Sequence, residues 1–140
     1  MIKRVKGELY VEGISLANIA KEFSTPCYVY SKKAIEENYL SYVEALESQS
    51  HLVCYAVKSN SNIAVLQLLS SLGAGFDVVS IGELERVLIA GGDPKKVVFS
   101  GLAKTEEEMT RALAVGIHCF NVESQSELLL LNKTAKTMSL

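Results

Sequence analysis

Four short apolar segments recur along most of the chain at a nearly constant interval, and this spacing restricts the fold more than any other feature. The segments are LVCYAVK (52–58), GFDVVS (75–80), KVVFSG (96–101) and HCFNVE (118–123). The intervals between corresponding positions, Val53, Phe76, Val97 and Cys119, are 23, 21 and 22 residues. Each contains valine, phenylalanine or tyrosine, which favour the enclosed, pleated surface of a strand. The spacing therefore predicts four buried strands with regular connections.

The stretches between these segments show the apolar spacing of helices, as in Ile63, Leu66 and Leu69. Three of the expected helices begin with a capping-box pattern, at 80–83, 105–108 and 124–127. Glycines stand where the helices are expected to end. Strands and helices that alternate in this way, with continuously apolar strands, predict an α/β fold in which helices cover a parallel sheet.

Two parallel architectures remain open, a doubly wound open sheet and a (β/α) barrel. A complete barrel has eight βα units and ~250 residues, whereas this chain has 140 residues and four units. The period would also suit leucine-rich repeats, but their leucine and asparagine frame is absent. We therefore expect either a small open sheet or the amino-terminal half of a (β/α)8 barrel.

The beginning of the chain has a different pattern. Residues 7–13 predict a short strand bounded by glycines, and residues 14–23 predict a short amphipathic helix. An extended stretch follows, and a longer helix is expected over 32–48. We expect residues 1–30 to form a separate amino-terminal segment and residues 31–140 to form the partial barrel.

The composition argues against several classes of function. Hydrophobic residues make up 49% of the chain and charged residues 21%, and the net charge is −2. This balance offers no electrostatic footprint for nucleic acid or an anionic membrane, and no apolar run approaches the ~20 residues that span a bilayer. Cys27, Cys54 and Cys119 are scattered through apolar segments. We therefore expect buried thiols in a reducing cytoplasm rather than disulfides.

Lys58 is the most distinctive residue, because it stands at the carboxyl end of an otherwise apolar strand. Enzymes with parallel sheets place their reacting groups at this edge. Strand alternation would put Cys54, Ala56 and Lys58 on one side, where the two small residues leave room beneath the amine. Desolvation there would favour the neutral amine that forms an imine. The alternative is an ordinary lysine at a strand end that reaches solvent.

Two carboxylates are further candidates. Asp77 lies inside an apolar strand, where a charge is costly unless it is paired, and Lys58 is its expected partner. A structural ion pair or backbone hydrogen bond is the alternative. Glu83 follows Ser80 at capping-box spacing, so its role could be purely structural. The two histidines have no partners at metal-binding spacing, and no metal site is predicted.

The motifs YAVKSNSN, GAGFDVVSIGELERVLIAGGDPKKVVFSGLAKTEEE and FNVESQSEL resemble the amino-terminal half of the bacterial diaminopimelate decarboxylases. The opening GELYVEGISLANIAKEFSTPCYVYS resembles the start of those enzymes as well. They are pyridoxal-phosphate enzymes of the alanine racemase-like fold. The resemblance implies half of a (β/α)8 barrel, preceded by a short strand and helix that belong to a second β domain.

The resemblance also implies roles for the three candidate residues. Lys58 corresponds to the lysine that holds pyridoxal 5′-phosphate as an internal Schiff base, and Asp77 to a carboxylate that helps to position that lysine. Glu83 corresponds to a glutamate of the active-site wall. The implied enzyme is a cytoplasmic homodimer of lysine biosynthesis that converts the small amino acid meso-2,6-diaminopimelate to L-lysine and carbon dioxide.

Enzymes of this family continue through four more barrel units and a β domain, which carry the phosphate loop and the residues contributed across the dimer. We therefore expect this chain to be a fragment with little or no activity alone. Uncovered strand edges and helix faces should make it self-associate. The alternatives are a truncated, non-catalytic chain that binds the cofactor or full-length subunits, a related decarboxylase acting on ornithine or arginine, and, ranked last, a small pyridoxal-phosphate carrier.

Overall fold

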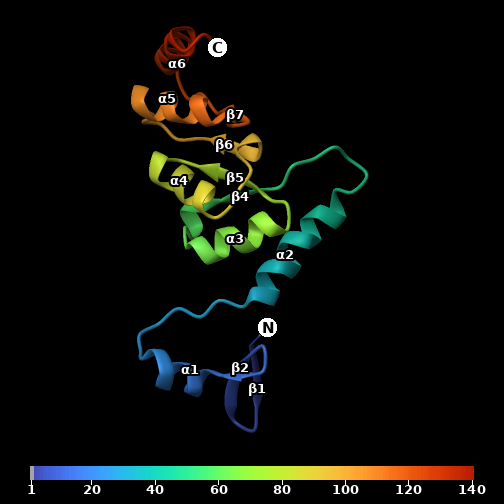
Figure 1. Cartoon of the computed structure of the whole chain (residues 1–140). Coiled ribbons are helices and arrows are strands. Elements are labelled where there is room, and N and C mark those ends of the chain that lie inside the picture. The colour runs from blue at the N-terminus through green and yellow to red at the C-terminus, as the bar shows by residue number, and fades with distance from the viewer. Residues whose placement is uncertain (1) are drawn as a thin grey trace. The chain divides into compact units, whose positions relative to one another are not determined.

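A computed structural model describes residues 2–140, and the chain divides into two compact units. Unit 1 comprises Met1–Ala45 and unit 2 comprises Leu46–Leu140. None of the helices in the described residues has both the length and the apolar character needed to cross a membrane. Each unit has its own sheet, so the two are described separately below (Figure 1).

Unit 1 contains an antiparallel sheet of β1 (Ile2–Val5), β2 (Glu8–Val11) and β3 (Ile14–Ser15), followed by helices α1 (Leu16–Phe23) and α2 (Lys32–Ala45). The strand expected within 7–13 and the helices expected within 14–23 and 32–48 are confirmed in outline. The sequence reasoning missed β1 and β3. Two-residue turns with positive φ, Lys6-Gly7 and Glu12-Gly13, join the three strands. Such turns match the twist of a hairpin.

Unit 2 alternates strands with helices, as the spacing predicts. Its four strands all run parallel in the order β4-β5-β6-β7. The strands are β4 (Cys54–Ala56), β5 (Gly75–Val78), β6 (Val97–Phe99) and β7 (Cys119–Phe120). The helices are α3 (Ile63–Ser71), α4 (Ile81–Ile89), α5 (Glu106–Val115) and α6 (Gln125–Thr137), and two 3-10 turns span Val57–Ser59 and Pro94–Lys96.

The strand order distinguishes between the two parallel architectures. A doubly wound sheet reverses its order at a switch point, whereas β4 to β7 follow one another without a reversal. Because crossovers between parallel strands are right-handed, an unreversed order places every connecting helix on the same face. Successive helices accordingly contact one another, α3 with α4, α4 with α5 and α5 with α6 (Figure 1). This is the winding of a barrel.

The core of unit 2 lies between the sheet and its helices. The strand residues that point into it are fully buried and are paired across β5 and β6, Phe76 with Val97 and Val78 with Phe99. Phe99 also stacks on Phe120 of β7, with ring centroids 5.9 Å apart. The helices contribute further buried residues, Leu66, Leu69, Leu84, Val87, Met109 and Ala112. Burial of these apolar side chains makes the main favourable contribution to the folding free energy of the unit.

The opposite face of the sheet is only partly covered. The strand register aligns one row of residues across this face, Ala56, Asp77, Val98 and Cys119. The first three of these residues are half-buried and Cys119 is exposed. Alternation of side chains along each strand separates this row from the core residues. The charge of Asp77 therefore does not enter the hydrophobic core.

The predicted helix caps are present, but only one is a complete capping box. At 105–108 the threonine and glutamate exchange both hydrogen bonds. In the other two, the serine accepts the expected bond from the glutamate amide. Each glutamate carboxylate, however, accepts from the amide that precedes the serine, Glu83 from Val79 at 2.8 Å and Glu127 from Glu123 at 3.1 Å. These carboxylates satisfy backbone donors at the carboxyl ends of the strands.

A buried ion pair fixes the last two βα units. The side chain of Lys104 is 1% exposed, and that of Glu127 is 8% exposed. The Lys104 ammonium donates to the carbonyls of Gly101 and Asn121, at 2.7 and 2.8 Å, and to Glu127 Oε1 at 2.5 Å. All three of its protons are thus used. The pair ties the loop after β6 to the end of β7 and the start of α6.

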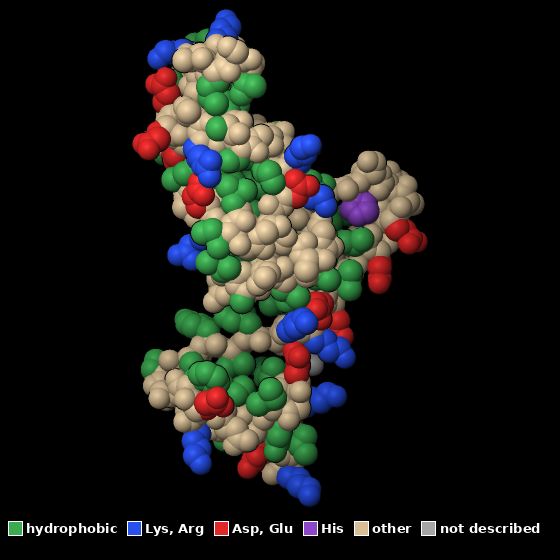
Figure 2. Space-filling model, in the orientation of Figure 1, with side chains coloured by type: hydrophobic (Ala, Val, Ile, Leu, Met, Phe, Trp, Pro, Cys, Tyr) green, Lys and Arg blue, Asp and Glu red, His purple; other side chains and the backbone are tan. Residues whose placement is uncertain are grey.

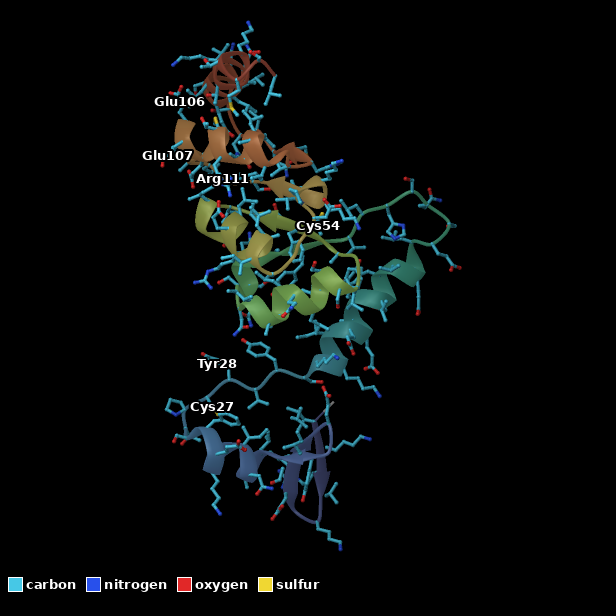
Figure 3. The ribbon with its side chains drawn as sticks, in the orientation of Figure 1. Cys27, Tyr28, Cys54, Glu106, Glu107 and Arg111 are labelled. Carbon is cyan, nitrogen blue, oxygen red and sulfur yellow. The ribbon has the colours of Figure 1, made fainter. Side chains whose placement is uncertain are left out.

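The expectation of buried thiols is wrong for two of the three cysteines. Cys27, in the extended stretch between α1 and α2, and Cys119, on the edge strand β7, are both exposed. Cys54 is half-buried on β4 (Figure 3). Burial, and secondly the negative charge of Asp77, raise the pKa of the Cys54 thiol. An apolar run predicts a strand, but it does not predict whether the strand's second face is covered.

Replacing Lys104 with methionine should lower the free energy of unfolding by about 3 kcal/mol at pH 7, because it leaves a buried carboxylate unpaired. Burial tends to raise the pKa of Glu127, but hydrogen bonds from Lys104 and from the Glu123 amide lower it below its ordinary 4.5. The pair's contribution is therefore present above that value and is lost as the pH falls through the lowered pKa. Urea unfolding should show that the difference in unfolding free energy between wild type and Lys104→Met becomes smaller at acidic pH.

The double variant Lys104→Met/Glu127→Leu is the control for this experiment. It removes both charges, so it should recover part of the stability lost by Lys104→Met alone. Equal unfolding free energies for wild type and Lys104→Met at pH 7 would contradict a stabilising pair.

Alkylation should distinguish the three thiols. At pH 8, iodoacetamide should modify Cys27 and Cys119 before Cys54. The thiolate is the nucleophile, and the raised pKa of Cys54 lowers the fraction of its thiol that is ionised, while its partial burial limits access of the reagent. Peptide mass mapping over time measures the order. The same reaction in urea is the control, since unfolding should bring the three rates together. Modification of Cys54 first in the folded protein would contradict the arrangement.

Candidate functional site

The side chain of Lys58 lies at the carboxyl end of β4, as expected, but not on the strand itself. Strand β4 ends at Ala56, and Lys58 is the middle residue of the 3-10 turn Val57–Ser59. Strand alternation therefore does not extend to it, and the prediction that it shares a side with Cys54 and Ala56 by alternation is wrong. Its side chain is exposed rather than desolvated. The Lys58 side chain therefore reaches solvent in this structure.

The backbone around Lys58 is held on both sides. The Tyr55 hydroxyl donates to the Asn60 carbonyl at 3.2 Å, and the Asn60 amide donates to the Val57 carbonyl at 3.1 Å. The side chain of Asn60 accepts from the Asn62 amide at 3.0 Å, and the Asn62 side chain caps α3. Among the described residues, no hydrogen bond or ion pair engages the Lys58 amine. The turn is thus braced while its amine stays available.

Asp77 lies beside β4 in the register, opposite Ala56. Its carboxylate oxygen Oδ1 accepts from the hydroxyl of Ser100 at 2.5 Å, and Asn121 Nδ2 donates to that hydroxyl at 3.0 Å. The expected ion pair with Lys58 is absent from the described residues, because that lysine stands beyond the strand end. The three side chains come from β5, the end of β6 and the end of β7.

Glu83, at the start of α4, accepts the hydrogen bond from the Val79 amide. It thus fixes the backbone where β5 passes into its helix. In the part of the chain that the structure describes, no hydrogen bond or ion pair joins Lys58, Asp77 and Glu83 to one another. Nor do the described residues bring together three histidine, cysteine or acidic side chains that could hold a metal.

Ser100 and Asn121 are site residues that the sequence reasoning missed. A usable signal was present, because both follow short apolar strands and alternate onto the face that carries Asp77. Ser100 and Asn121 were overlooked because neither is titratable. Together with Asp77 they form a hydrogen-bonded row across three neighbouring strands.

The arrangement suits a specific kind of chemistry. An exposed amine without a partner can condense with an aldehyde, and a carboxylate with a fixed orientation can position the groups around it. Lys58 and Asp77 meet these requirements at the carboxyl edge of a parallel sheet. Residues of this edge therefore fit a carbonyl cofactor, with Lys58 as the attachment point.

Comparison with known proteins agrees with this chemistry. Residues 32–140 match the family model described as pyridoxal-dependent decarboxylase, pyridoxal binding domain. The diaminopimelate decarboxylase of Pseudomonas aeruginosa is 61% identical over 128 residues, which are 91% of this chain and 31% of that protein. The diaminopimelate decarboxylase of Vibrio cholerae is 56% identical over 129 residues, 92% of this chain and 31% of that protein.

Solved structures give the same result. The crystal structure of diaminopimelate decarboxylase from M. jannaschii, in complex with L-lysine, is similar with a TM-score of 0.96 at 39% identity, covering 99% of this chain and 33% of that one. The chain thus spans about a third of the length of the relatives it matches. The predicted fold class, the amino-terminal half of a (β/α)8 barrel after a short β segment, is confirmed. The chain belongs to the pyridoxal-dependent decarboxylases, and its residues 32–140 match the pyridoxal-binding domain of that family.

Proposed function

We propose that this chain supplies the cofactor-bearing lysine of a carboxy-lyase that converts meso-2,6-diaminopimelate to L-lysine and carbon dioxide. The observation that carries the proposal is the exposed amine of Lys58, which no other described residue engages, on a braced turn at the carboxyl end of β4. The cofactor is pyridoxal 5′-phosphate, in keeping with the family. When bound, it supplies a conjugated ring that accepts the electrons left by the departing carboxylate.

The protein's own residues have distinct roles in this proposal. Lys58 provides the amine that holds the cofactor, and its braced turn keeps that amine at one position on the sheet edge. Asp77 orients the groups around this amine through its carboxylate. Glu83 acts through the backbone, because its carboxylate holds the Val79 amide and so fixes the end of β5 as part of the wall.

Diaminopimelate is the substrate we favour over other amino acids. Diaminopimelate decarboxylases match this chain at up to 61% identity among the relatives described above. The M. jannaschii structure was obtained with L-lysine, the product of the proposed reaction. The arginine decarboxylase of Paramecium bursaria Chlorella virus is only 24% identical, and that likeness supports the common fold alone.

We also propose the domain division, the oligomeric state and the location. The family match begins at residue 32, which supports a barrel portion of 31–140 after a segment of 1–30. Figure 2 shows hydrophobic side chains at the surface of the molecule. The exposed apolar residues of unit 2, which include Ile89, Leu102 and Leu129, support contacts with further protein surface, as in a homodimer. Three free thiols fit a reducing cytoplasm.

Borohydride reduction in the presence of pyridoxal phosphate should attach a pyridoxyl label to Lys58, because this amine is exposed at the carboxyl edge of the sheet and no other described residue engages it. Peptide mass mapping locates the label. Lys58→Ala should lose it, whereas Lys95→Ala, which removes another exposed lysine beside a strand, should keep it. A label that is absent, lies elsewhere or persists in Lys58→Ala would refute the cofactor assignment.

A chimera tests the reaction itself. Here this chain replaces the matching segment of the Pseudomonas aeruginosa enzyme, to which it is 61% identical. The chimera should release carbon dioxide from meso-2,6-diaminopimelate, and Lys58→Ala should lower kcat by about a thousandfold or more, since the covalent attachment of the cofactor is lost. Lys95→Ala is again the control. A folded chimera that prefers ornithine or arginine would refute the substrate assignment.

A further inference from the structure

The hydrogen-bonded row of Asp77, Ser100 and Asn121 has a fixed direction. The carboxylate can only accept, so the Ser100 hydroxyl donates its single proton to Asp77 Oδ1. The serine oxygen can then only accept from its other neighbour, and Asn121 does present its Nδ2 donor at 3.0 Å. Each group therefore determines the orientation of the next, from the edge strand inward to Asp77.

The backbone beneath the row is held rigidly. The Ser100 amide donates to the Val78 carbonyl at 2.8 Å, and the Asn121 amide donates to the Phe99 carbonyl at 2.9 Å. The carbonyl of Asn121 accepts from the buried Lys104 ammonium at 2.8 Å. Ser100 and Asn121 thus sit on the sheet ladder and on the buried ion pair, so their side chains can impose an orientation on Asp77.

The row leaves half of the carboxylate available. Ser100 occupies Oδ1, and no hydrogen bond or ion pair within the described residues engages Oδ2. The row also lies on the face opposite the core, with Asp77 half-buried and Asn121 exposed, so the packing of the core does not depend on it. A hydroxyl and an amide that fix one oxygen of a carboxylate and leave the other open are suited to presenting an acceptor.

We propose that Ser100 and Asn121 are positioning residues that orient the Asp77 carboxylate toward the chemistry of Lys58. This inference rests on the proposed function. It assigns to two uncharged residues the task of holding the acceptor in place. Ser100 acts on Asp77 directly, and Asn121 acts through Ser100. Their effect on the cofactor reaction is therefore expected to require Asp77.

The test measures the concentration of pyridoxal phosphate that half-saturates borohydride labelling of Lys58 in this chain. Ser100→Ala removes a hydrogen bond to a charged group and should raise that concentration about tenfold. Ser100→Thr keeps the hydroxyl and should stay near wild type. Asn121→Asp replaces the donor with a second carboxylate and should also raise it. Ser71→Ala, which removes a hydroxyl bonded within α3, is the matched control.

Two further measurements separate positioning from general structural damage. Thermal unfolding should give Ser100→Ala a melting temperature near that of wild type, since the core is untouched. In an Asp77→Ala background, Ser100→Ala should have no additional effect on labelling. An unchanged half-saturating concentration in Ser100→Ala, or an effect that persists in full without Asp77, would overturn this inference while leaving the cofactor assignment intact. Failure of the wild-type chain to label at Lys58 would overturn both.

Discussion

Parallel pairing is the constraint from which the rest of unit 2 follows. Two parallel neighbours cannot be joined by a tight turn, so each strand must be followed by a crossover of a dozen or more residues. The nearly constant interval between the apolar segments is the length of one such crossover with its strand. With β4 to β7 in unreversed order, every crossover returns over the same face. One face of the sheet is thereby buried, and all the strand ends meet at one edge.

That edge gathers polar backbone groups, and the sequence supplies a partner for many of them. The first amides of each helix and the last carbonyls of each strand would otherwise lack hydrogen bonds. Glu108 accepts from the amide of Thr105 in its own cap and also from Ile81, at the start of the neighbouring helix. The Lys104 ammonium donates to two carbonyls that follow β6 and β7, those of Gly101 and Asn121, and to the carboxylate of Glu127. Against this background of satisfied groups, the Lys58 amine and the second oxygen of Asp77 stand out as open to a ligand.

The parts of the fold that periodicity determines could be predicted, and the parts that local geometry determines could not. Apolar strands and amphipathic helices of unit 2 emerge from the spacing alone. The pattern did not predict that β4 stops at Ala56, so that Lys58 lies on a turn rather than on the strand face. It did not reveal β1 either, because IKRV is exposed throughout and has no apolar side. In the site, Asp77 could be predicted because a charged residue is unusual in an apolar strand. Ser100 and Asn121 are uncharged, so the sequence pattern did not single them out.

The separation of the two sheet faces explains how a carboxylate is tolerated inside a strand of this domain. Asp77 lies between Phe76 and Val78, which are both fully buried, yet it alternates onto the half-covered side. There it receives a charge-assisted hydrogen bond from Ser100 and does not weaken the packing of its neighbours. A valine at the same height on β6 shows that this face also accommodates an apolar residue. The carboxylate is therefore not required by the packing, and its hydrogen-bonded row with a serine and an asparagine argues for a role in chemistry.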